Sequence, residues 1–270
     1  MKPDVRRLLQ KLQKSFGADV VVLGADLKID GPRRPFGLKS LDDILDGGLP
    51  AGKIIEMYGP EHSGKTTLAY CAIARAQESG QTPAYIDAEG QWNIRWAKKQ
   101  GIDPSNLLIA RPVSAEAALE LLVTLVRAQL PLVVLDSVGA LAPLRTHKAR
   151  MDERQIGIVP LLLNQAMRKI LVLRSQTTVL LLNQLRERIS IGRRPLVFAE
   201  PFITPGGRGF HHFAHIRLEV TRVRFLWQKK GQLRYRIGQQ VAVQTTKSKV
   251  GTPFRRCELT LLYQKGFVHE

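Results

Sequence analysis

Cysteines, long apolar runs and acidic side chains are all scarce in this sequence of 270 residues. The only cysteines are Cys71 and Cys257, which excludes a framework of several disulfides and indicates a reducing compartment. No apolar run approaches the length of a membrane span, and the N-terminus lacks the apolar core of a signal peptide. We therefore expect a cytoplasmic protein with no membrane segment.

The shortage of acidic residues leaves a large excess of positive charge. Lys and Arg number 41 against 23 Asp and Glu, which gives a formal net charge of +18. Such an excess indicates a polyanionic partner, and nucleic acid is the first candidate. A solvated basic surface without a partner is the alternative.

One motif points to a specific chemistry. Residues 59–67 fit the pattern G-x-x-x-x-G-K-[ST] and stand between an apolar run at 54–58, expected as a buried strand, and a helical pattern at 68–74. In this context backbone N–H groups and a helix N-terminus can surround phosphates. We expect the loop to bind ATP or GTP, through Gly59, Pro60, Glu61, His62, Ser63, Gly64, Lys65, Thr66 and Thr67.

Within and near this loop, individual side chains have expected roles. Lys65 should reach the β- and γ-phosphates, and the Thr66 hydroxyl should help to hold Mg²⁺. Asp136 ends an apolar strand, where its carboxylate could orient the same Mg²⁺ through water; capping the next turn is the alternative. Glu89 follows another strand and could activate the attacking water, although an ordinary surface glutamate fits the pattern equally well.

The order of the expected elements indicates an α/β fold. From about residue 41 to 184 strands alternate with helices, which favours a mostly parallel sheet with helices on both faces. Two polar stretches, 143–156 and 185–209, resist assignment and are long enough to be functional. Alternating patterns at 216–246 then predict a hairpin, and a strand is expected at 257–263.

Ahead of this core the sequence predicts a helix at 4–16, a short strand at 19–24 and a linker at 25–40. Such a segment needs a surface to pack on, and the linker favours a neighbouring subunit. We therefore divide the chain into residues 1–35, a helix/strand segment that docks on another subunit, and residues 36–270, the nucleotide-binding core.

Several segments occur together in an order and spacing that is typical of one family. They are residues 59–67, 85–89, 133–141, 165–169, 182–186, 206–207 and 216–218. In these segments the sequence resembles the bacterial RecA recombinases, from the N-terminal helix to about Tyr263. The resemblance implies a RecA-type P-loop ATPase core with a mostly parallel central sheet flanked by helices. It further implies a DNA-dependent ATPase that polymerises as a helical filament on single-stranded DNA and promotes homologous pairing and strand exchange with double-stranded DNA.

The resemblance also implies roles for single residues in nucleotide chemistry. Glu89 matches the family's water-activating glutamate, and Gln184 matches the glutamine that senses the γ-phosphate. Trp96 falls where the family stacks an aromatic ring on adenine; a packed or surface tryptophan is the alternative. Lys247 and Lys249 match lysines that reach the ATP of the adjacent subunit; a basic edge strand is the alternative.

The two unassigned stretches coincide with the family's two DNA-binding loops, at about 144–157 and 185–207. Their arginines and glycine-exposed amides suit the phosphate backbone of DNA, and apolar side chains there match those that the family wedges between bases. The implied DNA-binding residues are Ile156, Arg168, Arg186, Arg188, Ile189, Gly206, Gly207 and Arg208.

Two features are less typical of the family. His211, His212 and His215 cluster without a cysteine or carboxylate at ligand spacing, so we expect an interface or packing role rather than a metal site. The predicted hairpin is either a further DNA surface or a solvated face over packed aromatics. Its residues in question are Arg222, Arg224, Phe225, Trp227, Lys229, Lys230, Arg234, Tyr235 and Arg236.

The sequence ends at Glu270, so we expect the family's C-terminal domain and acidic tail to be absent. Capture of duplex DNA would then fall to the basic core or to a partner, and a loader or single-strand-binding protein is a further expected partner. Two other functions stay open: a RecA-fold hexameric helicase or branch-migration motor, and an ATP-gated accessory protein of recombination without strand exchange. The expected location is the cytoplasm, in association with the nucleoid.

Overall fold

The computed structural model describes residues 3–18, 20–26, 31–144, 157–187 and 202–268. The chain forms two compact units, one ending at Gly31 and the other beginning at Pro32. The first unit contains helix α1 (Pro3–Phe16), as the sequence predicts. The predicted strand at 19–24 is not found, because residues 20–24 form turns and bends. A strand needs a neighbour for its backbone N–H and C=O groups, and none of the described strands pairs with this segment.

The second unit is built on a nine-stranded sheet with the order β13-β12-β11-β10-β3-β7-β6-β4-β5. Its parallel part comprises β5 (Leu108–Ala110), β4 (Ala84–Asp87), β6 (Leu132–Asp136), β7 (Thr178–Gln184), β3 (Ile54–Gly59) and β10 (Ile216–Lys230). Its antiparallel part adds β11 (Leu233–Ser248), β12 (Arg256–Leu262) and β13 (Gly266–Phe267). The prediction of a mostly parallel α/β sheet is confirmed.

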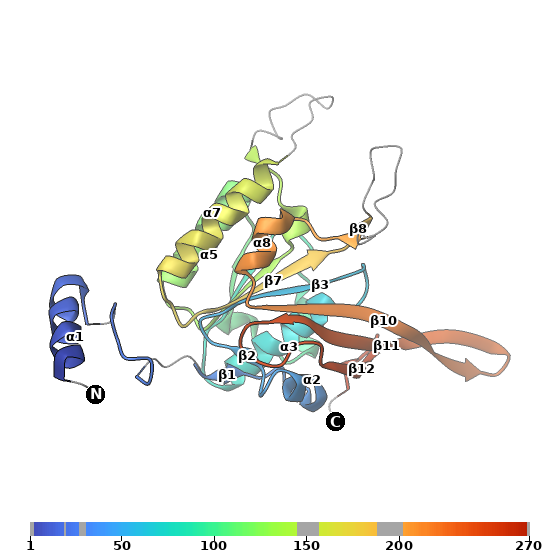
Figure 1. Ribbon diagram of the computed structural model, residues 1–270. Coiled ribbons are helices and arrows are strands. Elements are labelled where there is room, and N and C mark those ends of the chain that lie inside the picture. Colours follow the sequence, from blue (N-terminus) through green and yellow to red (C-terminus); the bar gives the residue numbers. More distant parts are fainter. Residues whose placement is uncertain (1–2, 19, 27–30, 145–156, 188–201, 269–270) are drawn as a thin grey trace, which may run out of the picture. The chain divides into compact units, whose positions relative to one another are not determined.

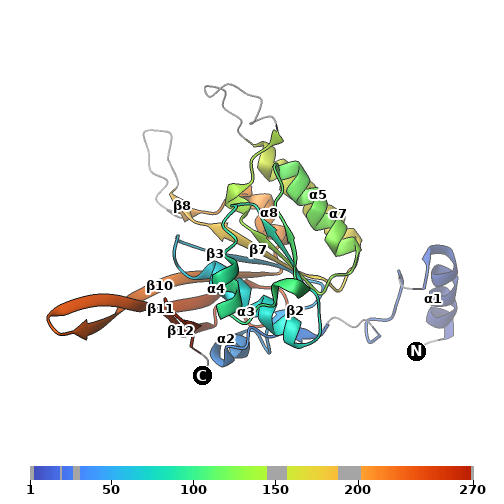
Figure 2. The same cartoon turned by 180° about the vertical axis from the view of Figure 1, so that it is seen from behind.

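Helices cover both faces of this sheet (Figures 1 and 2). One face packs against α2 (Lys39–Ile44), α3 (Lys65–Glu78) and α4 (Ile94–Lys99), and the other against α5 (Ala115–Arg127), α7 (Ile158–Val172) and α8 (Gly207–Phe213). Because successive side chains of a strand point to opposite faces, Ile55 and Met57 join the core under α3, while Ile54 joins the core under α5. The central parallel strands β3, β4, β6 and β7 are thus buried on both sides, as strands of parallel sheets usually are.

Several short elements were not predicted from the sequence. β1 (Arg33–Arg34) pairs with β2 (Leu49–Pro50), β8 (Arg186–Glu187) pairs with β9 (Phe202–Ile203), and 3₁₀ turns span Pro104–Asn106 and Val138–Ala140. Helix α8 begins in a glycine-rich stretch that we predicted as loop. Gly206 before it has a φ of 107°, a left-handed conformation that favours glycine, and so caps the helix. No helix within the described ranges is long and apolar enough to cross a bilayer.

Candidate functional site

The predicted phosphate loop connects β3 to α3 at the carboxyl edge of the parallel strands. Its first position requires glycine, because a Cβ on Gly59 would lie 2.0 Å from the carbonyl oxygen of Val220. At its far end Gly64 has a φ of 102° and directly precedes α3. The Lys65 ammonium extends back along the loop and donates to the carbonyl oxygens of Gly59 (3.0 Å) and Pro60 (2.7 Å). The loop is thus closed around its lysine.

A cavity of about 380 Å³ lies beside this loop. Its walls come from the loop itself and from the segments that follow β4, β6 and β7. The structure therefore brings together residues that are far apart in the sequence and that we had predicted separately. The lining residues are Glu61, His62, Ser63, Gly64, Lys65, Thr66, Thr67, Glu89, Gln91, Asp136, Ser137 and Gln184.

Asp136 is the most buried carboxylate of this cavity, with 6% of the residue exposed. Its Oδ2 accepts hydrogen bonds from the hydroxyls of Thr66 (2.9 Å) and Tyr85 (2.7 Å). Burial raises the pKa of Asp136 to about 6, although these two hydrogen bonds lower it. Burial likewise lowers the pKa of Lys65, against the attraction of the Asp136 carboxylate. The site thus holds one cation and one carboxylate out of water, close to two hydroxyl groups.

Glu89 is positioned by two neighbours that both donate to its Oε1. One is the Ser137 hydroxyl, and the other is the Gln184 side-chain amide at 3.0 Å. Gln184 ends β7, and the next backbone N–H, of Leu185, donates to the Gly59 carbonyl at 3.2 Å. These bonds link the glutamate and the phosphate loop to the beginning of the second predicted DNA loop.

A buried polar network that we did not predict lies beneath this site. Glu56 in β3 is fully buried, and its carboxylate contacts Arg217 Nε at 2.6 Å and accepts from Asn183 Nδ2 at 2.8 Å. Asn183 Nδ2 also donates to the carbonyl oxygen of Pro205 at 2.9 Å. The available signal was a glutamate inside the otherwise apolar run 54–58, since a buried carboxylate requires polar partners.

The same network reaches the far end of the second loop. Arg217 Nη2 donates to Thr204 Oγ1 at 3.4 Å, and that oxygen is hydrogen-bonded to His211 Nε2 at 2.7 Å. At the near end, the backbone N–H of Gln184 donates to Asn183 Oδ1 at 3.0 Å. Both ends of the segment between Gln184 and Pro205 are therefore tied to one buried carboxylate.

Lys247 and Lys249 do not line the nucleotide cavity of the single chain. Their ammonium groups donate to carbonyl oxygens at the C-terminal end of α8, from Lys247 to His211 and from Lys249 to His212 at 2.6 Å. Burial lowers the pKa of Lys247, and the nearby charges of Lys249 and Arg217 lower it further. Lys247, at the end of β11, and Lys249, just after it, thus contact the helix that follows the second predicted DNA loop.

The third histidine of the cluster has a different neighbour. His215 Nδ1 accepts a hydrogen bond from the backbone N–H of Ile54 at 3.1 Å. Burial lowers the pKa of His215 to about 4, and the charges of Lys53, Lys249 and Lys247 add to this effect. No group of three or more histidine, cysteine, aspartate or glutamate side chains placed to hold a metal ion occurs in the described part of the chain.

Trp96 lies beside the phosphate loop. Its indole N–H donates to Thr67 Oγ1 at 3.2 Å, and the half-buried ring packs against the core on the α3 side together with Trp92. The contact with Thr67 joins α4 to the beginning of α3. Trp96 is therefore partly packed and at the same time adjacent to the nucleotide cavity.

The implied DNA-binding residues are described only in part. Arg168 is exposed on α7, while Gly206 and Gly207 adopt left-handed conformations at the beginning of α8. The backbone of Arg186 lies in β8 and that of Arg208 in α8, without described side chains. Ile156, Arg188 and Ile189 lie outside the described residues.

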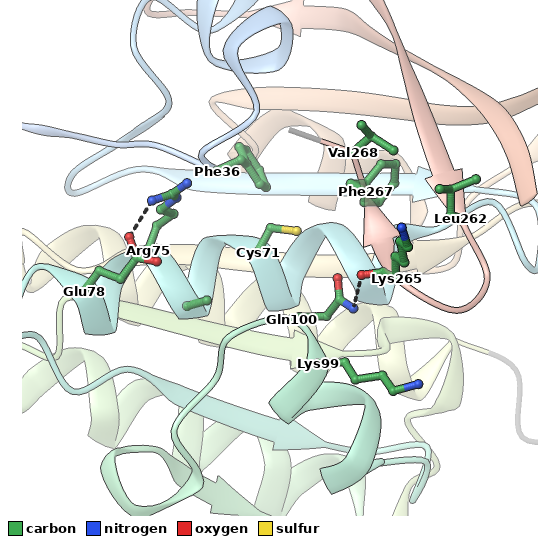
Figure 3. Close-up of a pocket in the computed structure, with 11 residues that line it drawn as sticks. Phe36, Cys71, Arg75, Glu78, Lys99, Gln100, Leu262, Lys265, Phe267 and Val268 are labelled. Carbon is green, nitrogen blue, oxygen red and sulfur yellow. Dashed lines mark hydrogen bonds and ion pairs between the residues drawn. The ribbon is translucent and has the colours of Figure 1, made fainter. Parts of the chain in front are cut away.

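A second cavity, of about 410 Å³, lies along α3 (Figure 3). It lies between the α3 residues Cys71 and Arg75 and the C-terminal residues Phe267 and Val268. None of the predicted nucleotide or DNA residues lines it. Both cysteines of the chain are buried as free thiols.

A parallel sheet with a glycine-bounded loop between β3 and α3, and with a carboxylate at the end of β6, defines a P-loop nucleoside-triphosphatase core. The particular family follows from comparison with known proteins. The family described as RecA N-terminal domain matches residues 4–268. The chain belongs to the RecA family, and so to the ATP- and DNA-binding proteins of DNA recombination and repair.

Curated relatives agree with this assignment. Protein RecA of Synechococcus elongatus is 40% identical over 263 residues, which cover 96% of this chain and 71% of the relative. Protein RecA of Acidothermus cellulolyticus is 42% identical over 240 residues, covering 87% of this chain and 67% of the relative. Protein RecA of Rhodopirellula baltica is 36% identical and is matched by 100% of this chain, over 71% of its own length.

Proposed function

We propose that this chain is a DNA-dependent ATPase that polymerises on single-stranded DNA and promotes homologous pairing and strand exchange. The observation that carries this proposal is the position of Gln184. Its side chain donates to Glu89 at the nucleotide cavity, while its backbone begins the second predicted DNA loop. Gln184 thus connects Glu89, the proposed base of hydrolysis, to the segment that would bind DNA. Binding of ATP at the cavity can therefore influence binding of DNA at the loop, and the reverse.

In the proposed chemistry, Glu89 accepts a proton from the water that attacks the γ-phosphate of ATP. Lys65 stabilises charge on the β- and γ-phosphates from a desolvated position, where a cation acts strongly. Thr66 and Asp136 present neighbouring oxygen atoms, the donor type that Mg²⁺ prefers, and these residues would hold the ion. When bound, Mg²⁺ would neutralise phosphate charge. Trp96 is proposed to stack on the adenine, because its half-buried ring lies beside Thr67.

Filament assembly would complete this site. We place residues 1–35 on a neighbouring subunit, because α1 exposes apolar side chains such as Leu8 and Phe16. Lys247 and Lys249 would then contribute charge to the ATP of the adjacent subunit. In the single chain they donate to carbonyl oxygens of the last turn of α8, which a helix cannot pair with its own N–H groups. Exchange of these carbonyls for phosphate oxygens would connect α8 to hydrolysis.

DNA would be held by the two loops and the elements that flank them. The proposed contacts on phosphates come from arginines and glycine amides, and those between bases from isoleucines. A loader or single-strand-binding protein is a proposed partner, and the nucleoid of the cytoplasm a proposed location. The proposed DNA contacts are Ile156, Arg168, Arg186, Arg188, Ile189, Gly206, Gly207 and Arg208.

The direct test measures ATP hydrolysis by the purified chain with and without single-stranded DNA. We expect DNA to stimulate hydrolysis, and Glu89→Gln to reduce the stimulated rate by about 10²- to 10⁴-fold while ATP binding is retained, because only proton transfer is lost. Glu78→Gln is the matched control, since it makes the same chemical change at an exposed position on α3 that does not line this cavity. The proposal fails if no concentration of single-stranded DNA changes the rate.

Two further measurements separate the alternative functions. Electron microscopy with single-stranded DNA and a non-hydrolysable ATP analogue should show open helical filaments, whereas closed rings would favour a hexameric motor. Incubation of an oligonucleotide with a homologous duplex should produce joint molecules. Binding without joint molecules would favour an accessory protein.

A further inference from the structure

The outer part of the β10–β11 hairpin is a two-stranded ribbon that extends beyond the sheet (Figure 1). β10 pairs with β3 only over Ile216–Glu219, and β11 pairs with β12 only over Gly238–Gln244. Farther out, the two strands pair only with each other among the described strands. On β10, the segment from Arg222 to Lys230 pairs with β11 alone and is roughly 30 Å long, at about 3.3 Å per residue. On β11, pairing with β12 ends at Gly238, so the strictly two-stranded part begins at Trp227 and Arg236.

The ribbon carries a run of positive charge that no acidic residue interrupts in the sequence. Between Glu219 and Glu258 the sequence contains no acidic residue. Within the described part of the chain, no ion pair involves a cation of the ribbon. These cations are Arg222, Arg224, Lys229, Lys230, Arg234 and Arg236.

Guanidinium groups of the ribbon pack against aromatic rings, whereas no described carboxylate pairs with them. The Arg236 guanidinium lies 4.0 Å from the ring centre of Phe225 and 5.1 Å from that of Trp227. Arg222 lies 4.2 Å from the Phe225 ring, and Arg234 lies 4.8 Å from the Trp227 ring. Since Trp227 is directly opposite Arg236 in the ladder, cations and rings share one face of the ribbon. Stacking of this kind attracts a guanidinium and leaves its N–H groups available for an anion.

We propose that this face of the ribbon binds duplex DNA through its phosphate backbone. Single-stranded DNA would need open aromatic faces on which its bases could stack, but Phe225 and Trp227 are each contacted by two guanidinium groups. What the face offers instead is a row of N–H donors suited to phosphate oxygens. A two-stranded β-ribbon is also one of the shapes that the major groove of B-DNA admits. The proposal rests on the proposed function in taking duplex DNA as a substrate of this chain.

The chemistry of this face predicts binding that is independent of DNA sequence. Its donors are arginine and lysine side chains at an exposed surface, which neutralise phosphates and release counterions. Affinity should therefore fall steeply with salt concentration. The number of phosphates that the ribbon neutralises can be obtained from the slope of log affinity against log salt.

The test compares two triple variants of the full chain by fluorescence anisotropy with labelled duplex and labelled single-stranded DNA. The ribbon variant is Lys229→Ala/Arg234→Ala/Arg236→Ala. The control, Lys39→Ala/Lys98→Ala/Arg127→Ala, removes equal charge from exposed positions of α2, α4 and α5. For the ribbon variant we expect a loss of duplex affinity of about 10- to 100-fold near 50 mM salt and a salt slope smaller by about three. The control should bind duplex like the parent chain.

Three outcomes of the binding measurements would contradict the proposal. Unchanged duplex binding by the ribbon variant would overturn it and leave this face for an acidic protein, and equal losses in both triple variants would show a nonspecific effect of net charge. Equal losses for duplex and single-stranded DNA would overturn the assignment to duplex.

ATP hydrolysis with single-stranded DNA should stay within about 2-fold in the ribbon variant, because this surface is remote from transition-state charge. If the parent chain shows no such hydrolysis but binds duplex through the ribbon, only the proposed function fails.

Discussion

The nucleotide cavity and the β10–β11 ribbon both present positive charge, but they hold it in opposite ways. In the cavity, the Lys65 ammonium is buried and donates to two backbone carbonyl oxygens. In the ribbon, Arg234 and Arg236 are exposed and lie over aromatic rings, in a stretch between Glu219 and Glu258 that has no acidic residue. The Lys65 ammonium is shielded from water, whereas the guanidinium groups of Arg234 and Arg236 are exposed to it.

This difference separates chemistry from binding. A buried charge interacts strongly with one nearby group because the local dielectric is low, and it can stabilise a transition state without reorganisation. Exposed charges are screened beyond about 10 Å in ordinary buffers, so each contributes little by itself. Many of them together suit a long polyanion. We therefore expect single substitutions to matter greatly in the cavity and only slightly in the ribbon.

The largest expected effect tests this comparison directly. Lys65→Ala should reduce ATP hydrolysis by at least about 10²-fold, because it removes a desolvated charge from the phosphates. Without nucleotide, the variant should be at least as stable to thermal unfolding as the parent chain, because burying an ammonium group opposes folding. Steady-state hydrolysis and calorimetry measure the two quantities.

The matched control is Arg234→Ala, which removes one charge from the ribbon. Its hydrolysis rate should stay within about 2-fold of the parent chain, because an exposed charge is screened. Similar rates for the two variants would break the distinction between the two regions.

An intermediate effect is expected from Asn183, which is fully buried between Glu56 and Pro205. Asn183→Ala should lower the DNA-stimulated rate by roughly 10-fold and leave the basal rate within about 3-fold, since it frees both ends of the second loop but touches no phosphate. Leaving the Glu56 carboxylate with one fewer donor should also cost about 1–3 kcal/mol of stability. The ratio of stimulated to basal rate separates coupling from simple destabilisation.

Asn164→Ala is the control for this variant. Asn164 lies on α7 near α8, and its Oδ1 is buried without a hydrogen-bond partner among the described residues. The ratio of stimulated to basal rate should therefore be unchanged. A parallel loss of both rates in Asn183→Ala would contradict a role in coupling.

Much of the cavity could be predicted because its signals are local. The strand, loop and helix around Lys65 are contiguous. Asp136 ends a strand with a clear apolar pattern, and Glu89 follows another. The buried network could not be predicted in the same way, because Glu56 and Arg217 are 161 positions apart and their pairing depends on β3 lying beside β10. The beginning of α8 was missed because glycine favours both loops and left-handed helix caps.

The contacts of Lys247 and Lys249 could not be predicted for the same reason, because they depend on the tertiary structure. Their sequence pattern indicates basic residues on a strand, but not that α8 supplies the acceptors. The cation–π contacts of the ribbon depend on cross-strand register with bulges between Arg222 and Arg224 and between Leu226 and Trp227. Register is set by pairing in three dimensions, so the sequence indicated charge and aromatics there but not their stacking.

The smallest expected effect concerns His215, which lies at the base of β10 where the ribbon's strand enters the sheet. Its pKa is lowered to about 4 by burial, with the charges of Lys53, Lys249 and Lys247 adding to the shift. The ordinary pKa of histidine in the unfolded chain is about 6.5, so the neutral residue contributes stability that is fully present above that pH and is lost as pH falls toward 4. His215→Asn removes the titrating group and retains an acceptor for the Ile54 N–H. Between about pH 7.5 and pH 5 the parent chain should lose roughly 1–2 kcal/mol more unfolding free energy than the variant, after allowance for solvent screening. Denaturant unfolding at the two pH values measures this difference. Equal losses in the two proteins would show that burial and the neighbouring cations do not lower the pKa of His215 in the folded chain.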